Sequence, residues 1–484
     1  MSTLGISLSD SGIVACLFDG EDTALFPLER ESVQSPGFAY LGDRGLILGE
    51  AAMAHFRLNP DRTTDRFWDQ LSLQTSALRV TRKPISNAHL AYLHLKHLWE
   101  RVTAANDEIT SVGLALPGPW LDPDPEQEEK LGILLGIISD LNIPLSVLLP
   151  QETANLHYDA PDEVAAAPVS FYLDLHQYHA QLYRLSGRSG VEPRVAARLP
   201  SCGFHHILND LHQKLTQLFL SETAFDIGED SEVEQEFFLK VRRLLAPQHN
   251  RATRELAVQY EGHSRKITVA EDTLERSLYD WTERLAAMVA TAARAEPEIG
   301  PNQPLVLQVS GRAESIPGLG RQIQRAVMRP VLLLSTERGA SAAGAATVAN
   351  RFEPVRDLQH TPIFNTWQRP EPAAGATAAG GPDASAYPPT HVLADAIAYP
   401  LHASGLLENG TDSGSLRLPG PIREAFRLPW AGSDLSVTPA EGLNLTVNQR
   451  AAEGSLTLKT GDSLSVRTEG EQFELQIIHC PPPD

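Results

Sequence analysis

One segment places several metal-binding residue types close together. In SCGFHHILNDLHQ, Cys202 is followed by His205, His206 and His212. If the segment is helical, His205 and His212 lie two turns apart on one face, an arrangement that could offer two imidazoles to a metal ion. Structural zinc sites usually draw their ligands from tighter spacings. We therefore favour an ordinary packed helix here and predict no metal site.

The remaining chemistry-bearing patterns are weaker. His94 and His97, in YLHLKHLWE, are three residues apart and are typical of a partly buried helix face. The sequence contains no GxSxG, HExxH, GxxxxGK[ST] or GxGxxG motif. The familiar hydrolase, zincin, P-loop and Rossmann signatures are therefore missing.

Composition excludes some classes of function. The chain of 484 residues has 61 acidic and 40 basic residues and a formal charge of -21, so it would repel a phosphate backbone, and we expect no nucleic-acid partner. Its three cysteines form neither a disulfide framework nor a CxxC pair, which favours a reducing cytoplasm. The most apolar stretch, residues 131–150, contains Asp140, Asn142 and Pro144 and predicts a helix followed by a buried strand, with no membrane insertion.

The elements expected to position any site alternate along residues 1–351, the pattern of an α/β domain. Apolar runs predict a hairpin over 4–18 that turns at 10–12, and strands over 111–116, 145–149, 169–175, 181–185, 305–309 and 331–334. Helices are expected over 85–106, 204–220, 232–245 and 270–295. Residues 352–389 are rich in Pro, Ala and Gly and predict a flexible linker. Residues 390–484 contain short alternating stretches that predict a small all-β domain resembling a sandwich.

The run GISLSDSGIVACLFDG, which begins at Gly5, resembles the first phosphate loop of the seventy-kilodalton heat-shock protein family. Six further segments resemble the family's later motifs in the same order: residues 35–60, 85–120, 141–160, 171–185, 305–324 and 339–349. The resemblance implies an actin-like two-lobed ATPase fold, with a duplicated mixed sheet and flanking helices. It also implies that ATP or ADP with Mg²⁺ would bind in the loops. The implied cofactor-binding positions are Gly5, Ser7, Ser9, Ser11, Asp174, His176, Gly311 and Arg312.

The first loop departs from the family pattern at the positions that matter for phosphoryl transfer. Ser7 stands where the family has a metal-facing aspartate, and Ser9 replaces a glycine. Asp10 follows, where a hydroxyl would face phosphate, and its charge would repel the ligand. The family's phosphate-facing lysine aligns with Met53, whose thioether cannot replace an ammonium group.

The other loops are also changed. The family's second carboxylate aligns with Gln151, although the adjacent Glu152 could substitute if the register shifts by one. The second loop retains Asp174, but three glycines become His176, Gln177 and Tyr178, and a threonine becomes His179: these side chains would occupy the space of phosphates. The adenosine loop retains Gly311 beside Arg312.

Two interpretations of these loops remain open. Asp174 and Glu152, the candidate catalytic residues, could form a remodelled site with His179. Alternatively, Asp174 caps a turn, the histidines lie on a strand edge and the pocket is closed, and the combined replacements favour this second interpretation. We accordingly expect a divergent scaffold or interaction module that recruits proteins, in part through the β-domain, and that is not an efficient ATPase. The alternative function is an ATP-dependent chaperone or regulatory ATPase.

Overall fold

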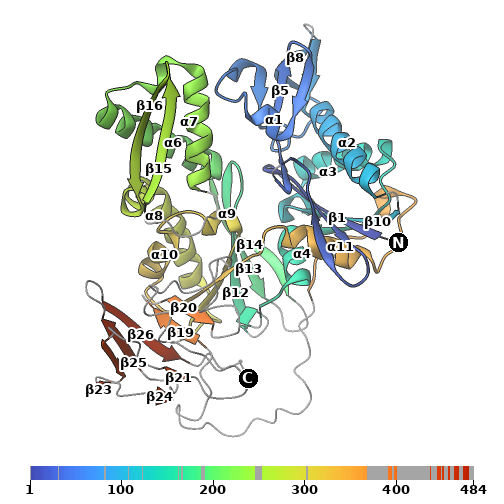
Figure 1. Cartoon of the computed structure of the whole chain (residues 1–484). Coiled ribbons are helices and arrows are strands. Elements are labelled where there is room, and N and C mark those ends of the chain that lie inside the picture. Colours follow the sequence, from blue (N-terminus) through green and yellow to red (C-terminus); the bar gives the residue numbers. More distant parts are fainter. Residues whose placement is uncertain are drawn as a thin grey trace, which may run out of the picture.

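The computed structural model describes residues 2–367, apart from residues 31, 81–82, 107, 123, 162, 165–166, 187–190, 246–252 and 301–302, and beyond them only strand segments between residues 391 and 478. The described chain is a mixed α/β structure, in which helices flank mixed sheets (Figure 1). We call residues 2–158 the first half and residues 169–335 the second half, because each half contains one of the two principal sheets.

The first principal sheet is built around a hairpin. β1 (Ser2–Ser9) pairs antiparallel with β2 (Gly12–Phe18), which also pairs with β3 (Thr23–Phe26) and β4 (Gln34–Pro36). On its other side β1 runs parallel to β10 (Ile109–Leu116), and β10 runs parallel to β11 (Leu145–Pro150). The order is therefore β11-β10-β1-β2-β3. The predicted hairpin over 4–18 is confirmed, and its turn presents Asp10 and Ser11 at the end of β1.

The second principal sheet repeats this plan. β12 (Val169–Leu175), β13 (His179–Ser186) and β14 (Glu192–Pro200) form an antiparallel meander. β17 (Leu305–Val309) and β18 (Val331–Ser335) then continue the sheet in parallel from β12. Over this part the order is β14-β13-β12-β17-β18, a three-stranded meander plus two parallel strands, as in the first half. The β12–β13 turn is thus the counterpart of the β1–β2 turn.

The helices occur where apolar residues recur at helical spacing. They are α1 (Gly49–Met53), α2 (Asn87–Ala105), α3 (Pro125–Asp140), α4 (Gln151–Tyr158), α6 (Phe204–Thr223), α7 (Ser231–Leu244), α8 (Glu271–Ala295), α9 (Gly311–Glu314), α10 (Leu319–Val327) and α11 (Ala340–Ala349). The four predicted helices are confirmed as α2, α6, α7 and α8, with ends shifted by a few residues. Carboxylates begin two of the helices, since Asp124 caps α3 and Asp230 caps α7 through backbone amides.

Smaller hairpins complete the described chain. They involve β5 (Ala39–Gly42), β6 (Gly45–Leu48), β7 (Thr63–Thr64), β8 (Thr75–Val80), β9 (Lys83–Ser86), β15 (Thr253–Tyr260) and β16 (His263–Ala270). Four short 3-10 turns are η1 (Pro60–Arg62), η2 (Gly118–Leu121), η3 (Ile227–Glu229) and η4 (Leu358–His360).

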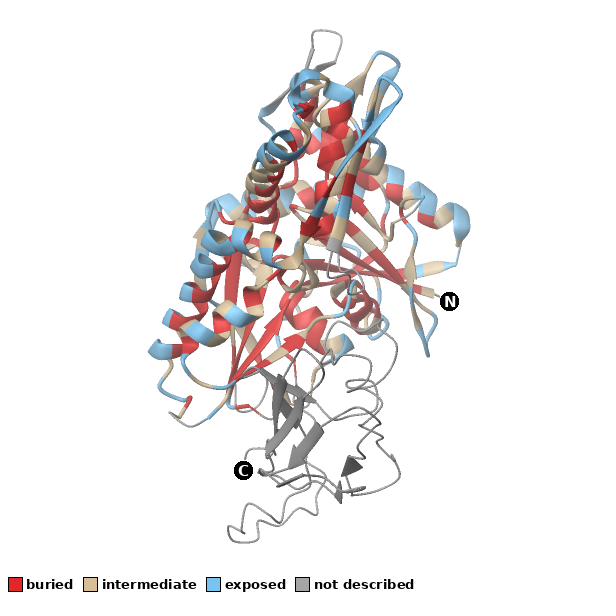
Figure 2. Ribbon diagram, turned by 60° about the vertical axis from the view of Figure 1, so that its left-hand side comes forward, coloured by how far each residue is buried: buried red, intermediate tan, exposed pale blue. Residues whose placement is uncertain are grey.

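Each half has its own hydrophobic core. Leu4, Ile6 and Leu8 of β1 pack with Trp68 and the apolar face of α2, whereas Phe171 of β12 belongs to the core of the second half. Figure 2 shows the buried residues concentrated on the sheets and on the inner sides of the helices. Helix α11 packs so closely on β1 that a Cβ atom at Gly5 would lie 1.9 Å from the carbonyl oxygen of Ala342. Close packing therefore requires glycine at position 5.

The segment predicted to be a linker is only partly described. Its beginning packs on the fold, since the Phe364 amide donates to the Leu148 carbonyl over 2.8 Å and Trp367 pairs with Val191. Residues 368–389 lie outside the described residues. Further on, strands occur at the predicted alternating stretches, as β22 (Asn444–Val447), β24 (Leu456–Thr457), β25 (Ser463–Arg467) and β26 (Gln472–Ile478). With β19 (His391–Ala394), β20 (Ile397–Pro400), β21 (Ser436–Val437) and β23 (Arg450–Ala451) they are the described part of the predicted β-domain, and β20 pairs with β18.

Candidate functional site

The turn between β1 and β2 directly contacts the turn between β12 and β13. The Asp10 carboxylate, 6% exposed, accepts hydrogen bonds from the backbone amides of Gln177 (3.0 Å) and Tyr178 (3.2 Å). These two amides belong to the segment expected to be the second phosphate loop. A carboxylate that accepts two backbone N–H bonds is held by the same kind of contact that a loop offers to a phosphate.

The turn between β12 and β13 is also hydrogen-bonded to the start of α6, on the side away from Asp10. The carbonyls of His176 and Gln177 accept hydrogen bonds from the amides of Phe204 (2.9 Å) and His205 (2.8 Å) at the start of α6. A Cβ atom at Gly203 would lie 2.4 Å from the His179 backbone nitrogen, so only glycine fits beneath the loop. The loop is therefore fixed between Asp10 on one side and the first turn of α6 on the other.

Two histidines surround the Asp10 carboxylate. The rings of His176 and His179 stack with centroids 4.3 Å apart, and their Nδ1 atoms lie 3.8 and 4.0 Å from the Asp10 oxygens. Nε2 of His176 lies 3.4 Å from an oxygen of Asp174. Burial lowers the pKa of His179 to about 3, with a further contribution from His176, so its ring is neutral at pH 7. The imidazoles thus fill the space between the two loops.

The charge on Asp10 is supported by its surroundings. Burial alone would raise the pKa of this carboxyl, but His176, the Gln177 amide and Arg312 oppose it, and the net pKa is lowered. Arg312 also donates a hydrogen bond to the Ser11 hydroxyl. The expected first and adenosine loops are therefore joined by an arginine side chain.

An aromatic ring and two arginines lie next to these loops. The guanidinium carbon of Arg312 is 5.2 Å from the ring centroid of Phe204, and that of Arg242 is 5.8 Å from it. Burial lowers the pKa of Arg242 to about 10, and Arg312 lowers it further. Two desolvated cations thus contact one aromatic side chain of the protein itself, an arrangement that stabilises them.

A second contact joins the two halves beside the first. Asp65, which follows β7 and is 5% exposed, has its Oδ2 3.2 Å from Nδ1 of His205 and 3.5 Å from Nε2 of Gln177. The Arg66 guanidinium carbon lies 4.3 Å from the centre of the Tyr178 ring. Burial would raise the pKa of Asp65, but its contacts with His205 lower it overall. Gln177 therefore touches two buried carboxylates of the first half.

Glu152 lies at the start of α4 and is 3% exposed. Burial raises its pKa to about 8, and Asp174 adds to the shift. At pH 7 this side chain is mostly protonated. A Cβ atom at Gly118 would lie 2.3 Å from its Oε1 atom, so the glutamate is packed tightly in place.

The other candidate positions have local structural partners. The Ser7 hydroxyl accepts from Gln151 Nε2 and from the Ser341 hydroxyl, each over 2.8 Å, and the Ser9 hydroxyl accepts from the Ser11 amide over 3.2 Å. Gly311 is the first residue of α9.

Met53, which the resemblance aligns with the family's lysine, packs beside Phe38 and Tyr40. Its backbone carbonyl accepts a hydrogen bond from Gln235 over 3.2 Å. This side chain therefore contributes apolar packing near the contact of the two halves.

The structure brings Ser11, Asp174, His176 and Arg312 together around Asp10. Gly5 faces α11 instead. The sequence analysis treated Asp10 only as a repulsive charge, considered His205 only as a possible metal ligand, and missed Asp65 and Arg242 altogether. One signal was available: an acidic residue in an amide-lined turn has the oxygens to take the place of an anionic ligand.

The histidines of α6 do not form a metal site with Cys202 in the structure. His205 contacts Asp65, whereas His212 packs against the rings of Phe237 and Phe238. Within the described residues, no group of three or more His, Cys, Asp or Glu side chains is arranged to hold a metal ion. No described helix combines the length and apolarity needed to span a membrane.

Compared with known proteins, the chain matches no protein-family model and no curated protein sequence.

Proposed function

We propose that this chain is a divergent relative of the seventy-kilodalton heat-shock proteins, with an actin-like two-lobed fold, that acts as a non-catalytic scaffold for other proteins. The repeated strand order of the two principal sheets supports the actin-like fold. The order of the seven sequence segments supports the family relationship. The strand order and the order of the segments support only the fold and the family relationship. Whether the chain binds or hydrolyses nucleotide depends on the side chains in the expected phosphate loops.

The observation that carries the proposal is the contact between Asp10 and the second loop. The amides of Gln177 and Tyr178, which would face a phosphate in an ATPase of this kind, are already hydrogen-bonded to a carboxylate of the same chain. A triphosphate would have to displace that carboxylate, and its charge would meet the buried Asp10 at close range. Efficient phosphoryl transfer also needs metal-binding carboxylates and a phosphate-facing cation, positions that hold Ser7 and Met53 here.

Titration with magnesium ATP tests the proposal. A ligand present at 100 times its dissociation constant would stabilise the fold by about 2.7 kcal/mol, a shift that thermal unfolding detects readily. At about 1 mM magnesium ATP or ADP we expect no shift and no saturable heat in calorimetry. Micromolar binding with turnover that is lost in Asp174→Asn would overturn the proposal and establish the ATPase alternative.

Recruitment of proteins needs its own measurement. Cross-linking of the full chain in cells, followed by mass spectrometry, should give reproducible links to other proteins, including links from residues 390–484. The same links should persist in Asp174→Asn, since the proposed function needs no turnover. Links that vanish when cellular ATP is depleted would contradict a nucleotide-independent scaffold.

A further inference from the structure

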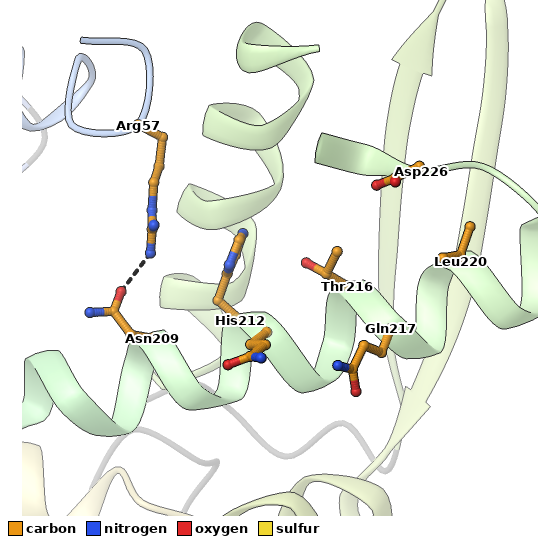
Figure 3. Close-up of a pocket in the computed structure, with 8 residues that line it drawn as sticks. Arg57, Asn209, His212, Thr216, Gln217, Leu220 and Asp226 are labelled. Atoms are coloured by element: carbon orange, nitrogen blue, oxygen red, sulfur yellow. Dashed lines mark hydrogen bonds between the residues drawn. The ribbon is translucent and has the colours of Figure 1, made fainter. Parts of the chain in front are cut away.

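A groove runs along α6 on the side that faces the first half. Its volume is about 520 Å³, and its lining includes Arg57, Asn209, His212, Thr216 and Asp226 (Figure 3). Pockets of about 300–1,000 Å³ are typical of ligand-binding sites. Arg57 comes from the first half and the other four from the second, so an occupant of the groove would touch both halves.

Three buried polar atoms without hydrogen-bond partners belong to residues that line this groove. They are Nε of Arg57, Nε2 of His212 and Oγ1 of Thr216. His212 is 7% exposed, and burial lowers its pKa to about 4, so its ring is neutral at pH 7. Leaving a buried donor or acceptor unpaired costs about 1–3 kcal/mol. These three atoms lie beneath the groove surface, so an occupant would reach them only after the lining side chains shift.

The chemistry of the lining matches a polypeptide backbone. Asn209, Gln213 and Gln217 are spaced by four residues and form a row of carboxamides along α6. A carboxamide presents both an acceptor and donors, which are the groups needed to pair with the C=O and N–H of an extended chain. Leu220, 42% exposed, adds one apolar contact at the far end of the row.

The two charged residues that line the groove lie toward its opposite ends. Arg57 lies at one end, where its guanidinium donates to Asn209 over 2.5 Å and lies 3.9 Å from an oxygen of Glu234, with 26% of the side chain exposed. Asp226 lies toward the other end, near Leu220 (Figure 3). At a rise of about 1.5 Å per residue, the helix between Asn209 and Leu220 spans about 16 Å. An extended peptide of about five residues covers that length.

We propose that the groove along α6 binds an extended segment of a partner protein, with an acidic residue at Arg57 and a basic residue about four positions away at Asp226. This inference deepens the proposed scaffold function and rests on it. It does not depend on the state of the nucleotide loops, so a failed peptide test would leave the magnesium ATP result unaffected.

The test uses the full chain and a panel of fluorescently labelled peptides of about seven residues in a Ser/Ala background. One peptide type carries Glu and Lys four positions apart, in both orders, while two others carry Glu at both positions or Lys at both. Fluorescence polarisation should show saturable binding of a mixed-charge peptide, at least tenfold tighter than of either uniform type. Asp226→Lys should reverse this ranking and favour the peptide with two glutamates, because the charge at that end of the groove changes sign.

Two further variants separate groove binding from adhesion elsewhere. Gln217→Ala removes one carboxamide from the row along α6 and should weaken the mixed-charge peptide about threefold, whereas Glu222→Gln, on α6 outside the groove lining, should leave its affinity unchanged. Thermal unfolding confirms that each variant is folded. The proposal is overturned if no peptide of the panel saturates, or if Asp226→Lys leaves the ranking as it is in the unaltered chain.

Discussion

At the scale of single residues, the proposed function depends on Asp10. Its two oxygens accept hydrogen bonds from the amides of Gln177 and Tyr178, and the interaction is buried. A negative charge repels phosphate, and the sequence analysis considered only this repulsion. The same carboxylate can also accept hydrogen bonds from the backbone amides that a phosphate would bind. Whether Asp10 reaches these amides depends on how close the two turns lie in space, although Asp10 and Gln177 are 167 residues apart in sequence. That spatial distance is set by the packing of the two halves.

Asp10→Ala should destabilise the fold by about 2–4 kcal/mol, because two buried amides lose a charged acceptor. Asp10→Asn keeps one acceptor oxygen and should lose about half as much. Urea unfolding at pH 7 measures both values, with the exposed Asp272→Asn as a control that changes little. The folded-state pKa of Asp10 is lowered, so the stabilisation is complete above the unfolded pKa, about 4, and is lost as pH falls through the folded value. An Asp10→Ala variant as stable as the unaltered chain would refute this role.

Glu152 predicts the opposite pH dependence. Its pKa is raised from 4.5 in the unfolded chain to about 8, so the folded state holds a proton that the unfolded state releases within this window. Stability therefore falls as pH rises between these values, by up to about 1.4 kcal/mol per pH unit. Relative to Glu152→Gln, which stays neutral, the unaltered chain should lose about 2 kcal/mol between about pH 5.5 and about pH 7.5. Parallel stability curves for the two proteins would show that Glu152 is ionised in the fold.

At the scale of elements, the turn between β12 and β13 depends on α6. The first turn of α6 donates two amides to the carbonyls of the β12–β13 loop, and Gly203 lets the loop approach. The loop's conformation is therefore determined by a helix that begins after β14. A glycine-rich phosphate loop needs no such support from bulky side chains, but a loop that carries His176, Gln177 and Tyr178 does.

Gly203→Ala tests this dependence. The added Cβ would lie within 2.5 Å of the loop backbone, at Tyr178 C and His179 N. Something must shift, and we expect a loss of at least about 2 kcal/mol together with faster amide hydrogen exchange at Gln177 and Tyr178. Gly136→Ala is the matched control, since a Cβ atom there, on α3, meets no atom within 4 Å and should stabilise the helix by up to about 1 kcal/mol. Unchanged exchange at the loop in Gly203→Ala would contradict the dependence.

Elements with continuous apolar runs were predictable from the sequence. The strands over 169–175 and 305–309 match β12 and β17 residue for residue, because such strands are buried on both faces. β14 was missed, since its residues, EPRVAARLP, are mostly solvent-exposed and carry no apolar pattern. The hairpin of β15 and β16 was missed as well. β16 begins with four consecutive polar, exposed residues, HSRK, so the alternation of polar and apolar residues expected of a strand is absent there. Side-chain contacts between the halves could not be predicted, since they depend on the tertiary arrangement and not on local periodicity.

At the scale of the whole molecule, side chains of the first half hold the second half at three places. Asp10 contacts the β12–β13 loop, Asp65 contacts His205, and Arg57 bridges to the second half. The Arg57 guanidinium donates to Asn209 over 2.5 Å, and its backbone amide donates to Gln235 over 2.6 Å. In an ATPase with the proposed actin-like fold, the ligand would hold the halves together, whereas here side chains connect them. The shape of this protein should therefore not respond to nucleotide.

The joint action of Asp10 and Arg57 can be measured with Asp10→Ala and Arg57→Met. Each single variant keeps the halves joined through the two remaining contacts and bears the cost of its own unpaired groups. In the double variant only the contact between Asp65 and His205 remains of the three, so the halves separate more easily and water can satisfy the exposed groups. Its loss of stability should therefore be at least about 0.5 kcal/mol smaller than the sum of the single losses. The control pair is Asp10→Ala with Arg321→Met, which breaks an exposed ion pair to Glu275 within the second half and should add independently. Strict additivity of Asp10→Ala and Arg57→Met would show that the two side chains do not act on one common closed state. A non-additive result accompanied by a larger radius of gyration in small-angle scattering, only in the double variant, would show that side chains close this protein.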